Sequence, residues 1–158
     1  MKEERCVLNE GELVDIVGYN EYFGWYYAGV LDRQLNVGTD VLRAAMRDFV
    51  GTMTISANVN KPIQISEFGA GAKAGRKGGT ADVWTEEYQA SVYASQIDLL
   101  SRSPQVQGMT PWVLKDFRAM LRTHPEIQQY HNRKGLVDPN GQRKMAFDVL
   151  ANFYAQPW

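Results

Sequence analysis

The chain has 158 residues and a formal net charge of −1, and charged residues make up 22% of it. This length can bury the core of one domain. The balanced charge excludes a partner recruited by bulk electrostatics, such as nucleic acid or a membrane surface. No apolar run reaches the length of a membrane span. No apolar segment follows the charged start MKEERC, so we expect no signal peptide.

Cysteine and histidine are too scarce to predict a metal site. Cys6 is the only cysteine, which excludes an intramolecular disulfide and a zinc site built on cysteines. Its free thiol is compatible with a reducing compartment such as the cytoplasm. His124 and His131 lack a second pair of ligands at metal-binding spacing. We therefore expect neither a metal nor another cofactor.

The first half of the chain predicts a strand, a helix and a second strand. Residues 13–20 (LVDIVGYN) are β-branched and almost continuously apolar, which is typical of a strand covered on both faces. A helix is expected over residues 39–53, with Thr39 as its N-cap. Its buried stripe comprises Val41, Leu42, Ala45, Met46, Phe49 and Val50. The second strand is expected over residues 62–68.

The second half predicts a loop, a helix, a third strand and a last helix. Five glycines make residues 69–79 a flexible surface loop, since the phosphate-binding pattern G-x-x-x-x-G-K-[ST] is absent. The helix is expected to begin at Thr85. The third strand is expected over residues 111–117 (PWVLKDF). A polar loop over residues 118–133 and a helix over residues 142–154 follow it.

Strands that alternate with helices imply parallel βαβ units and an α/β fold. Three strands are few for an open parallel sheet, and a complete eight-fold α/β barrel needs about 200 residues or more. We therefore expect part of a larger architecture, with its site at the carboxyl ends of the strands. These ends combine aromatic residues with two carboxylates, Glu67 and Asp116, which suits sugar binding because rings stack on sugar faces while polar groups hold hydroxyls.

Four segments at these positions resemble glycoside hydrolase family 2, the β-glucuronidase and β-galactosidase group. VDIVGYNEYFGWY is similar to the family's sixth barrel strand with its N-x-Y-x-G-W-Y segment. KPIQISEFGA is similar to the seventh strand with its S/T-E-Y/F-G nucleophile motif. TPWVLKDFR is similar to the eighth strand, and NRKGLVDPNGQRKMAFDVL to the N-x-K-G segment before the last barrel helix. The resemblance implies that residues 1–158 form the C-terminal part of a (β/α)8 TIM barrel, strands six to eight.

The resemblance also implies a retaining exo-glycosidase. In such enzymes one carboxylate attacks the anomeric carbon to form a covalent glycosyl-enzyme, and a second carboxyl group serves as acid and then base. Glu67 falls at the nucleophile position, where a rigid strand end would hold it near the sugar. The alternative for Glu67 is a carboxylate that caps a strand end or forms a salt bridge there.

Four further positions imply a pocket for a carbohydrate substrate. Asn20, Tyr22 and Tyr26 fall where the family lines its sugar pocket, and Trp112 falls at the aromatic floor beneath the sugar. The alternative for these residues is ordinary aromatic packing at a barrel rim or in the core.

The N-x-K-G match implies the type of sugar. Asn132 and Lys134 occupy the positions that hold the substrate carboxylate in β-glucuronidases, so a β-D-glucuronide is the expected substrate. The alternatives are a solvated basic loop, since Arg133 adjoins, or an enzyme for neutral β-galactosides. The last strand departs from the family wording W-N-F-A-D-F at Val113 and Lys115, which leaves the exact substrate open.

The pair Asn20–Glu21 resembles the acid/base motif of the wider enzyme clan. However, the letters EYFGWY belong to strand six rather than strand four, and strand alternation places Glu21 on the opposite face from Asn20 and Tyr22. We therefore do not assign Glu21 as the acid/base, and no other segment supplies it. We expect a fragment that is inactive and poorly soluble alone, or that assembles with itself or with a missing N-terminal barrel half. A non-catalytic carbohydrate-binding remnant is the remaining alternative.

Overall fold

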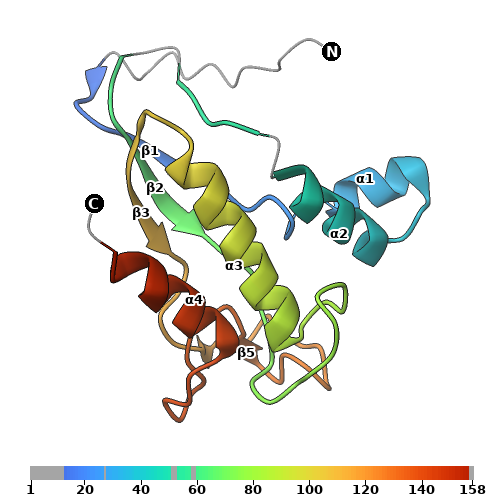
Figure 1. Cartoon of the computed structure of the whole chain (residues 1–158). Helices are drawn as coiled ribbons and strands as arrows, with labels where there is room; N and C mark the ends of the chain where they lie inside the picture. Colours follow the sequence, from blue (N-terminus) through green and yellow to red (C-terminus); the bar gives the residue numbers. More distant parts are fainter. Residues whose placement is uncertain (1–12, 27, 51–52, 58–59, 157–158) are drawn as a thin grey trace.

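Three parallel strands form the central sheet (Figure 1). The computed structural model describes residues 13–26, 28–50, 53–57 and 60–156. The strands pair in the order β1-β2-β3, and their bounds are β1 (Val17–Asn20), β2 (Ile63–Phe68) and β3 (Val106–Pro111). Both pairings are parallel, which confirms the predicted α/β fold with βαβ units.

Four helices connect and cover these strands in the described part of the chain. They are α1 (Ala28–Leu35), α2 (Thr39–Val50), α3 (Glu86–Ser101) and α4 (Met145–Tyr154). In Figure 1, α3 runs across one face of the sheet with α4 beside it, whereas α1 and α2 form a pair to one side. Two short strands, β4 (Phe117–Arg118) and β5 (His131–Asn132), pair antiparallel between β3 and α4. No described helix has the length and apolar character needed to cross a membrane.

The central strand β2 carries the core of the sheet. Ile65 and Phe68 are fully shielded from solvent, and they pack in one apolar cluster with Tyr93 and Leu100 of α3. Burying a side chain of this size contributes about 1.5–3 kcal/mol. This packing holds the carboxyl end of β2 in place, and Glu67 is the penultimate residue of that strand.

The N-terminus of α3 follows from its sequence. Thr85 is the N-cap, and its hydroxyl accepts a hydrogen bond from the backbone N–H of Tyr88 at 3.1 Å. Glu86 and Glu87 lie in the first turn, where the helix dipole favours negative charge. The predicted start of this helix at Thr85 is therefore confirmed.

A buried ionic network anchors the segment that precedes α4. The Nζ of Lys144 donates to Asp116 Oδ1 at 2.8 Å and to the carbonyls of Ala72 at 2.7 Å and Arg133 at 3.1 Å. Asp116 also accepts the backbone N–H of Gly135 at 2.8 Å and lies 3.4 Å from the Arg133 guanidinium. Asp116, which the sequence predicted as a carboxylate of the site, is therefore a structural anchor.

Two predicted strands have different bounds in the structure. β1 begins at Val17, the one residue of this strand that is buried, and Leu13 is 89% exposed. Gly18 and Asn20, which share one face of β1, are both exposed, so the prediction of a strand covered on both faces is wrong. The third strand lies at 106–111 rather than 111–117, because pairing with β2 outweighs the apolar composition of the later segment.

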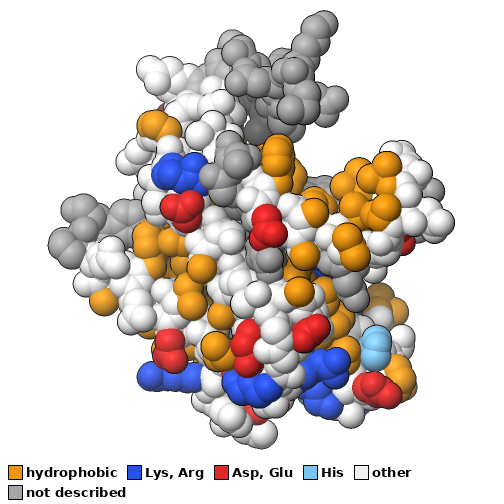
Figure 2. Space-filling model, turned by 45° about the vertical axis from the view of Figure 1, so that its right-hand side comes forward, with side chains coloured by type: hydrophobic (Ala, Val, Ile, Leu, Met, Phe, Trp, Pro, Cys, Tyr) orange, Lys and Arg blue, Asp and Glu red, His pale blue; other side chains and the backbone are white. Residues whose placement is uncertain are grey.

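The structure departs from the prediction for both helices of the α1–α2 pair, for α1 in its presence and for α2 in its burial. The sequence predicted α2 but not α1. On α2, Leu42 is buried, whereas Val41 and Phe49 of the predicted buried stripe are 62% and 57% exposed. Figure 2, in which the right-hand side of Figure 1 is turned forward, shows several groups of hydrophobic side chains on the surface.

Candidate active site

The candidate site lies where the carboxyl ends of β1 and β2 meet the turn after β1. Asn20, the last residue of β1, is the register partner of Glu67. The backbone N–H of Glu21 donates to the carbonyl of Glu67 at 2.8 Å, so the ladder continues into the turn. This connection brings the tyrosines of the turn to the end of β2.

Tyr22 binds the carboxylate of Glu67 directly. The hydroxyl of Tyr22 donates to Glu67 Oε2 at 2.7 Å. Burial, and then the hydrogen bond and the negative charge of Glu67, raise the pKa of Tyr22 well above its ordinary value of 10. Tyr22 therefore stays protonated and acts as a fixed donor to one oxygen of the carboxylate.

Lys134 lies between the two tyrosines of the turn. Its Nζ is 3.8 Å from the ring centroid of Tyr22 and 3.9 Å from that of Tyr26. The same Nζ donates to the Tyr26 hydroxyl at 2.6 Å. Lys134 is only 4% exposed. Burial and the charge of Arg122 lower the pKa of Lys134 to about 7, and Glu67 opposes them. The geometry thus brings together Glu67, both tyrosines and Lys134.

The two predicted asparagines lie beside this group and make different contacts. Asn132 is buried, and its Oδ1 accepts the backbone N–H of Lys134 at 3.1 Å. It therefore shapes the segment that presents the lysine. Asn20 is exposed, and its Oδ1 accepts the hydroxyl of Ser66 at 2.7 Å. Because Asn132, Arg133 and Lys134 are all buried, this segment is not the solvated basic loop that the sequence left open.

Trp112 lies directly after β3. Its backbone N–H donates to the carbonyl of Phe68 at 2.9 Å, which holds it next to the end of β2. Trp112 is 37% exposed, and its ring meets Phe117 edge to face with 6.3 Å between the ring centroids. A partly exposed ring at this strand end can stack on a ligand, whereas a core ring cannot.

Two loop residues at the site escaped sequence analysis. Arg122 and Gln128, from the loop between β4 and β5, line a pocket of about 20 Å³ together with Trp25, Trp84, Asn132, Arg133 and Lys134. In the described part of the chain, no carboxylate forms an ion pair with the Arg122 guanidinium. Nothing in the local sequence distinguishes this arginine from other basic loop residues.

Glu21 takes no part in this group. Its side chain is 1% exposed and its Oε1 accepts the backbone N–H of Phe23. Burial raises its pKa to about 7, against the opposing effects of the Phe23 N–H and the Gln96 side chain. Glu21 therefore faces α3, whereas Tyr22 faces Glu67, as the strand alternation predicted.

Comparison with known proteins relates the chain to glycoside hydrolases. No family model matches it. A β-glucuronidase of Streptococcus agalactiae is 27% identical over 135 residues, which cover 84% of this chain and 20% of the relative. The mouse β-glucuronidase is 27% identical over 147 residues, covering 89% of this chain and 20% of the relative.

The chain is also similar to a solved structure of a glycoside hydrolase. The GH2 β-galacturonidase from Eisenbergiella tayi, bound to galacturonate, is 25% identical with a TM-score of 0.65. The match covers 91% of this chain and 24% of that protein. The chain thus spans about a fifth of the length of the curated relatives it matches. The resemblance to glycoside hydrolase family 2 that the four motifs indicated is confirmed by these relatives.

Proposed function

We propose that this chain, a relative of one segment of glycoside hydrolase family 2 enzymes, supplies the nucleophile side of a retaining exo-β-glycosidase site. The observation that carries the proposal is the Tyr22 hydroxyl bound at 2.7 Å to Glu67 at the end of β2. An exposed strand-end carboxylate that served only as a cap would need no such buried, permanently protonated donor.

In this proposal Glu67 is the nucleophile. One carboxylate oxygen attacks the anomeric carbon while the bond to the leaving oxygen breaks, and an acid/base carboxyl group protonates that oxygen. Water, deprotonated by the same group, then attacks the anomeric carbon and releases Glu67 as a carboxylate. Tyr22 donates to Oε2, which orients the carboxylate and leaves its other oxygen to attack.

The proposed substrate is a β-D-glucuronide. Lys134 is a buried amine whose direct contacts are two tyrosine rings and a tyrosine hydroxyl. Glu67 acts on it only at longer range, so a substrate carboxylate would supply a direct ion-pair partner for its charged form. The relatives include β-glucuronidases and a β-galacturonidase bound to galacturonate, and uronic acids share that carboxylate. A neutral β-galactoside would leave Lys134 and Arg122 uncompensated, which makes it the weaker alternative.

The remaining predicted residues complete the proposed sugar site. The exposed ring of Trp112 would stack on the apolar face of the sugar. Asn20 would hold a sugar hydroxyl, and Asn132 would fix the backbone that presents Lys134. These roles follow from the family positions and from the exposure of Trp112 and Asn20 at the strand ends.

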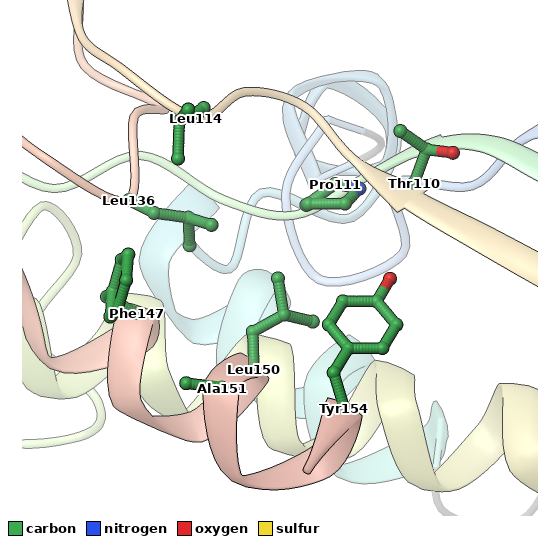
Figure 3. Close-up of a pocket in the computed structure, with 8 residues that line it drawn as sticks. All are labelled: Thr110, Pro111, Leu114, Leu136, Phe147, Leu150, Ala151 and Tyr154. Carbon is green, nitrogen blue, oxygen red and sulfur yellow. The ribbon is translucent and has the colours of Figure 1, made fainter. Parts of the chain in front are cut away.

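We further propose that the chain forms the last three βα units of a (β/α)8 barrel. The outer edge of β3 pairs with no other strand in the described residues. Beside that edge, an apolar groove of about 320 Å³ opens between β3 and α4 (Figure 3). It is lined by Thr110, Pro111, Leu114, Leu136, Phe147, Leu150, Ala151 and Tyr154. A further parallel strand and its helix, from the rest of the barrel, would cover this edge and groove.

The proposed partial barrel also explains why no acid/base group lies beside Glu67. In the retaining mechanism two carboxyl groups lie about 5–5.5 Å apart. Since Glu21 faces α3 and Asp116 is locked in an ionic network, neither can fill this position beside Glu67. The acid/base would therefore come from the missing barrel half, and the chain alone would be inactive. The rival interpretation is a non-catalytic carbohydrate-binding remnant.

Complementation tests this proposal. The chain is mixed with the remainder of the S. agalactiae β-glucuronidase, without the segment that matches this chain. Hydrolysis of chromogenic β-D-glucuronide and β-D-galactoside is then followed, with Glu67→Gln as the matched control. We expect glucuronide hydrolysis only in the mixture and none with Glu67→Gln. Equal activity of the control variant would exclude Glu67 as the nucleophile, and an inactive but folded complex would favour the non-catalytic remnant.

A further inference from the structure

Buried polar side chains fasten the turn after β1 to helix α3. Glu21 and Gln96 are 1% and 0% exposed. Glu21 Oε1 accepts the backbone N–H of Phe23, and Gln96 Nε2 donates to the carbonyl of the same residue at 3.1 Å. The hydroxyl of Tyr88, also on α3, donates to the carbonyl of Gly24 at 2.6 Å. We refer to Glu21 and Gln96 with the Phe23 peptide groups as the turn latch.

Two oxygens of the turn latch lack partners. Glu21 Oε2 and Gln96 Oε1 are both buried without a hydrogen-bond partner among the described residues. When Glu21 is ionised, both atoms are acceptors and neither can satisfy the other. Buried polar atoms without partners are unfavourable and rare in folded proteins. A proton on Glu21 converts one of these acceptors into a donor.

We propose that Glu21 is a positioning residue that acts as a neutral carboxylic acid. Its proton, taken from solvent, lies on Oε2 and is donated to Gln96 Oε1. The resulting bond joins the turn to α3 and thereby holds the Tyr22 hydroxyl on Glu67. This inference rests on the proposed function, in which the bond between Tyr22 and Glu67 orients the nucleophile.

The surroundings of Glu21 favour the neutral form. Burial raises its pKa to about 7, although the Phe23 N–H and the Gln96 side chain act in the opposite direction. The titratable and charged groups on the packed elements are Glu86, Glu87, Tyr88, Tyr93 and Asp98 of α3, Glu67 of β2 with its partner Tyr22, Lys134, and Arg43 of α2, whose Nε donates to the carbonyl of Trp25 at 3.2 Å. Burial raises the pKa values of Tyr22 and Tyr93 and so keeps both neutral. The pKa of Lys134 is also lowered to about 7, so an experiment must separate Lys134 from Glu21.

The proposal implies that the turn after β1 loses its attachment to α3 at alkaline pH. Below neutrality the turn latch is complete, and the Tyr22 hydroxyl stays on the carboxylate of Glu67. Above neutrality Glu21 becomes a buried carboxylate beside an unsatisfied amide oxygen, so the turn detaches from α3. A glutamine at position 21 has the same shape as the neutral acid and carries the donor at every pH.

The first test observes Glu21 itself. The full chain is labelled with ¹³C at the glutamate side-chain carboxyl carbons and titrated by NMR from about pH 5 to about pH 9. The signal that is missing from Glu21→Gln identifies Glu21. We expect its midpoint near 7. A signal that stays at the ionised position throughout this range would overturn the proposal, because Glu21 would then be a carboxylate at every pH tested.

The second test asks whether Glu21 positions Tyr22. The ring signal of ¹³C-labelled Tyr22 should shift with the same midpoint as Glu21 in the natural chain. It should show no such shift in Glu21→Gln, and should still shift in Lys134→Met. In Gln96→Met, which lacks the acceptor, Tyr22 should resemble the alkaline form at every pH. A shift that persists in Glu21→Gln and disappears in Lys134→Met would overturn the proposal, since Lys134 would then control the turn.

Neither test requires turnover, so a failure of the positioning role of Glu21 can be distinguished from a failure of the proposed function. If Glu21 titrates near 7 and moves Tyr22 while the complemented protein shows no hydrolysis, the turn latch is supported and the glycosidase proposal fails. If hydrolysis is observed while Tyr22 is insensitive to the state of Glu21, the glycosidase proposal is supported and the positioning role of Glu21 is overturned.

Discussion

Replacing Lys134 with methionine tests whether this lysine is retained for binding rather than for stability. Burial lowers its pKa from 10.5 to about 7. At about 1.4 kcal/mol per pKa unit, this difference corresponds to a penalty of roughly 5 kcal/mol for the charged form. Its contacts with two tyrosine rings return about 0.5–2 kcal/mol each. We therefore expect Lys134→Met to stabilise the fold by about 2 kcal/mol at about pH 6.

The pH dependence has a definite sign. Because the folded-state pKa lies below the unfolded value, the penalty is fully present below about pH 7 and disappears as the pH rises towards 10.5. The advantage of Lys134→Met should therefore shrink in alkaline buffer. Urea denaturation of both proteins at about pH 6 and about pH 9.5 measures the difference in the free energy of unfolding.

Lys144 provides the matched control. It is also a buried lysine whose pKa burial lowers, but its Nζ binds Asp116 at 2.8 Å. Lys144→Met would remove the closer of the two cationic partners of the buried Asp116 carboxylate and leave only Arg133 at 3.4 Å, so we expect a loss of about 3–5 kcal/mol. If Lys134→Met destabilised the chain as Lys144→Met does, Lys134 would be a structural lysine and the argument for a vacant counter-charge would fail.

Three further substitutions test other parts of the site and the fold. Tyr22→Phe removes a hydrogen bond to a carboxylate, worth about 1.5–3 kcal/mol, so kcat of the complemented protein should fall about 10- to 100-fold; an unchanged kcat would contradict its role. Arg122→Gln removes a positive charge that lowers the pKa of the neighbouring lysine, so the alkaline limit of glucuronide binding, measured as KM against pH, should move to higher pH. Gly69→Ala should destabilise the fold by about 1–3 kcal/mol in urea denaturation, because φ is +127° and the new Cβ would meet the Tyr93 hydroxyl. Gly75→Ala has a positive φ but open space, and should cost less; equal losses would refute the steric argument.

Local signals explain why parts of the fold could be predicted from the sequence. The apolar segment that became β2 ends on Glu67, and the threonine that caps α3 precedes two glutamates. Each of these features involves residues that are neighbours in the chain. The strand 106–111 carries Gly108 and ends on Pro111, so its local pattern is weak and only the pairing with β2 defines it.

The contacts of the site could not be predicted from local pattern. Lys134 and Tyr26 are 108 residues apart, and only the folded chain places the Nζ on the tyrosine hydroxyl. Asp116 ends an apolar segment just as Glu67 does, yet Lys144 and Arg133 occupy its carboxylate. Family motifs predicted the positions of the tyrosines and of Lys134, but they carried no information on Arg122, which reaches the pocket from the polar loop between β4 and β5.

Mechanism-based labelling tests the central claim, that Glu67 is the nucleophile, most directly. The chain, alone and mixed with the remainder of the S. agalactiae β-glucuronidase, is incubated with activated 2-fluoro-glucuronide and 2-fluoro-galactoside, and intact mass and peptide mapping follow. We predict a stable adduct on Glu67 in the complemented protein, formed with the glucuronide and absent in Glu67→Gln. An adduct on another carboxylate, or none on a folded complex, would contradict the claim.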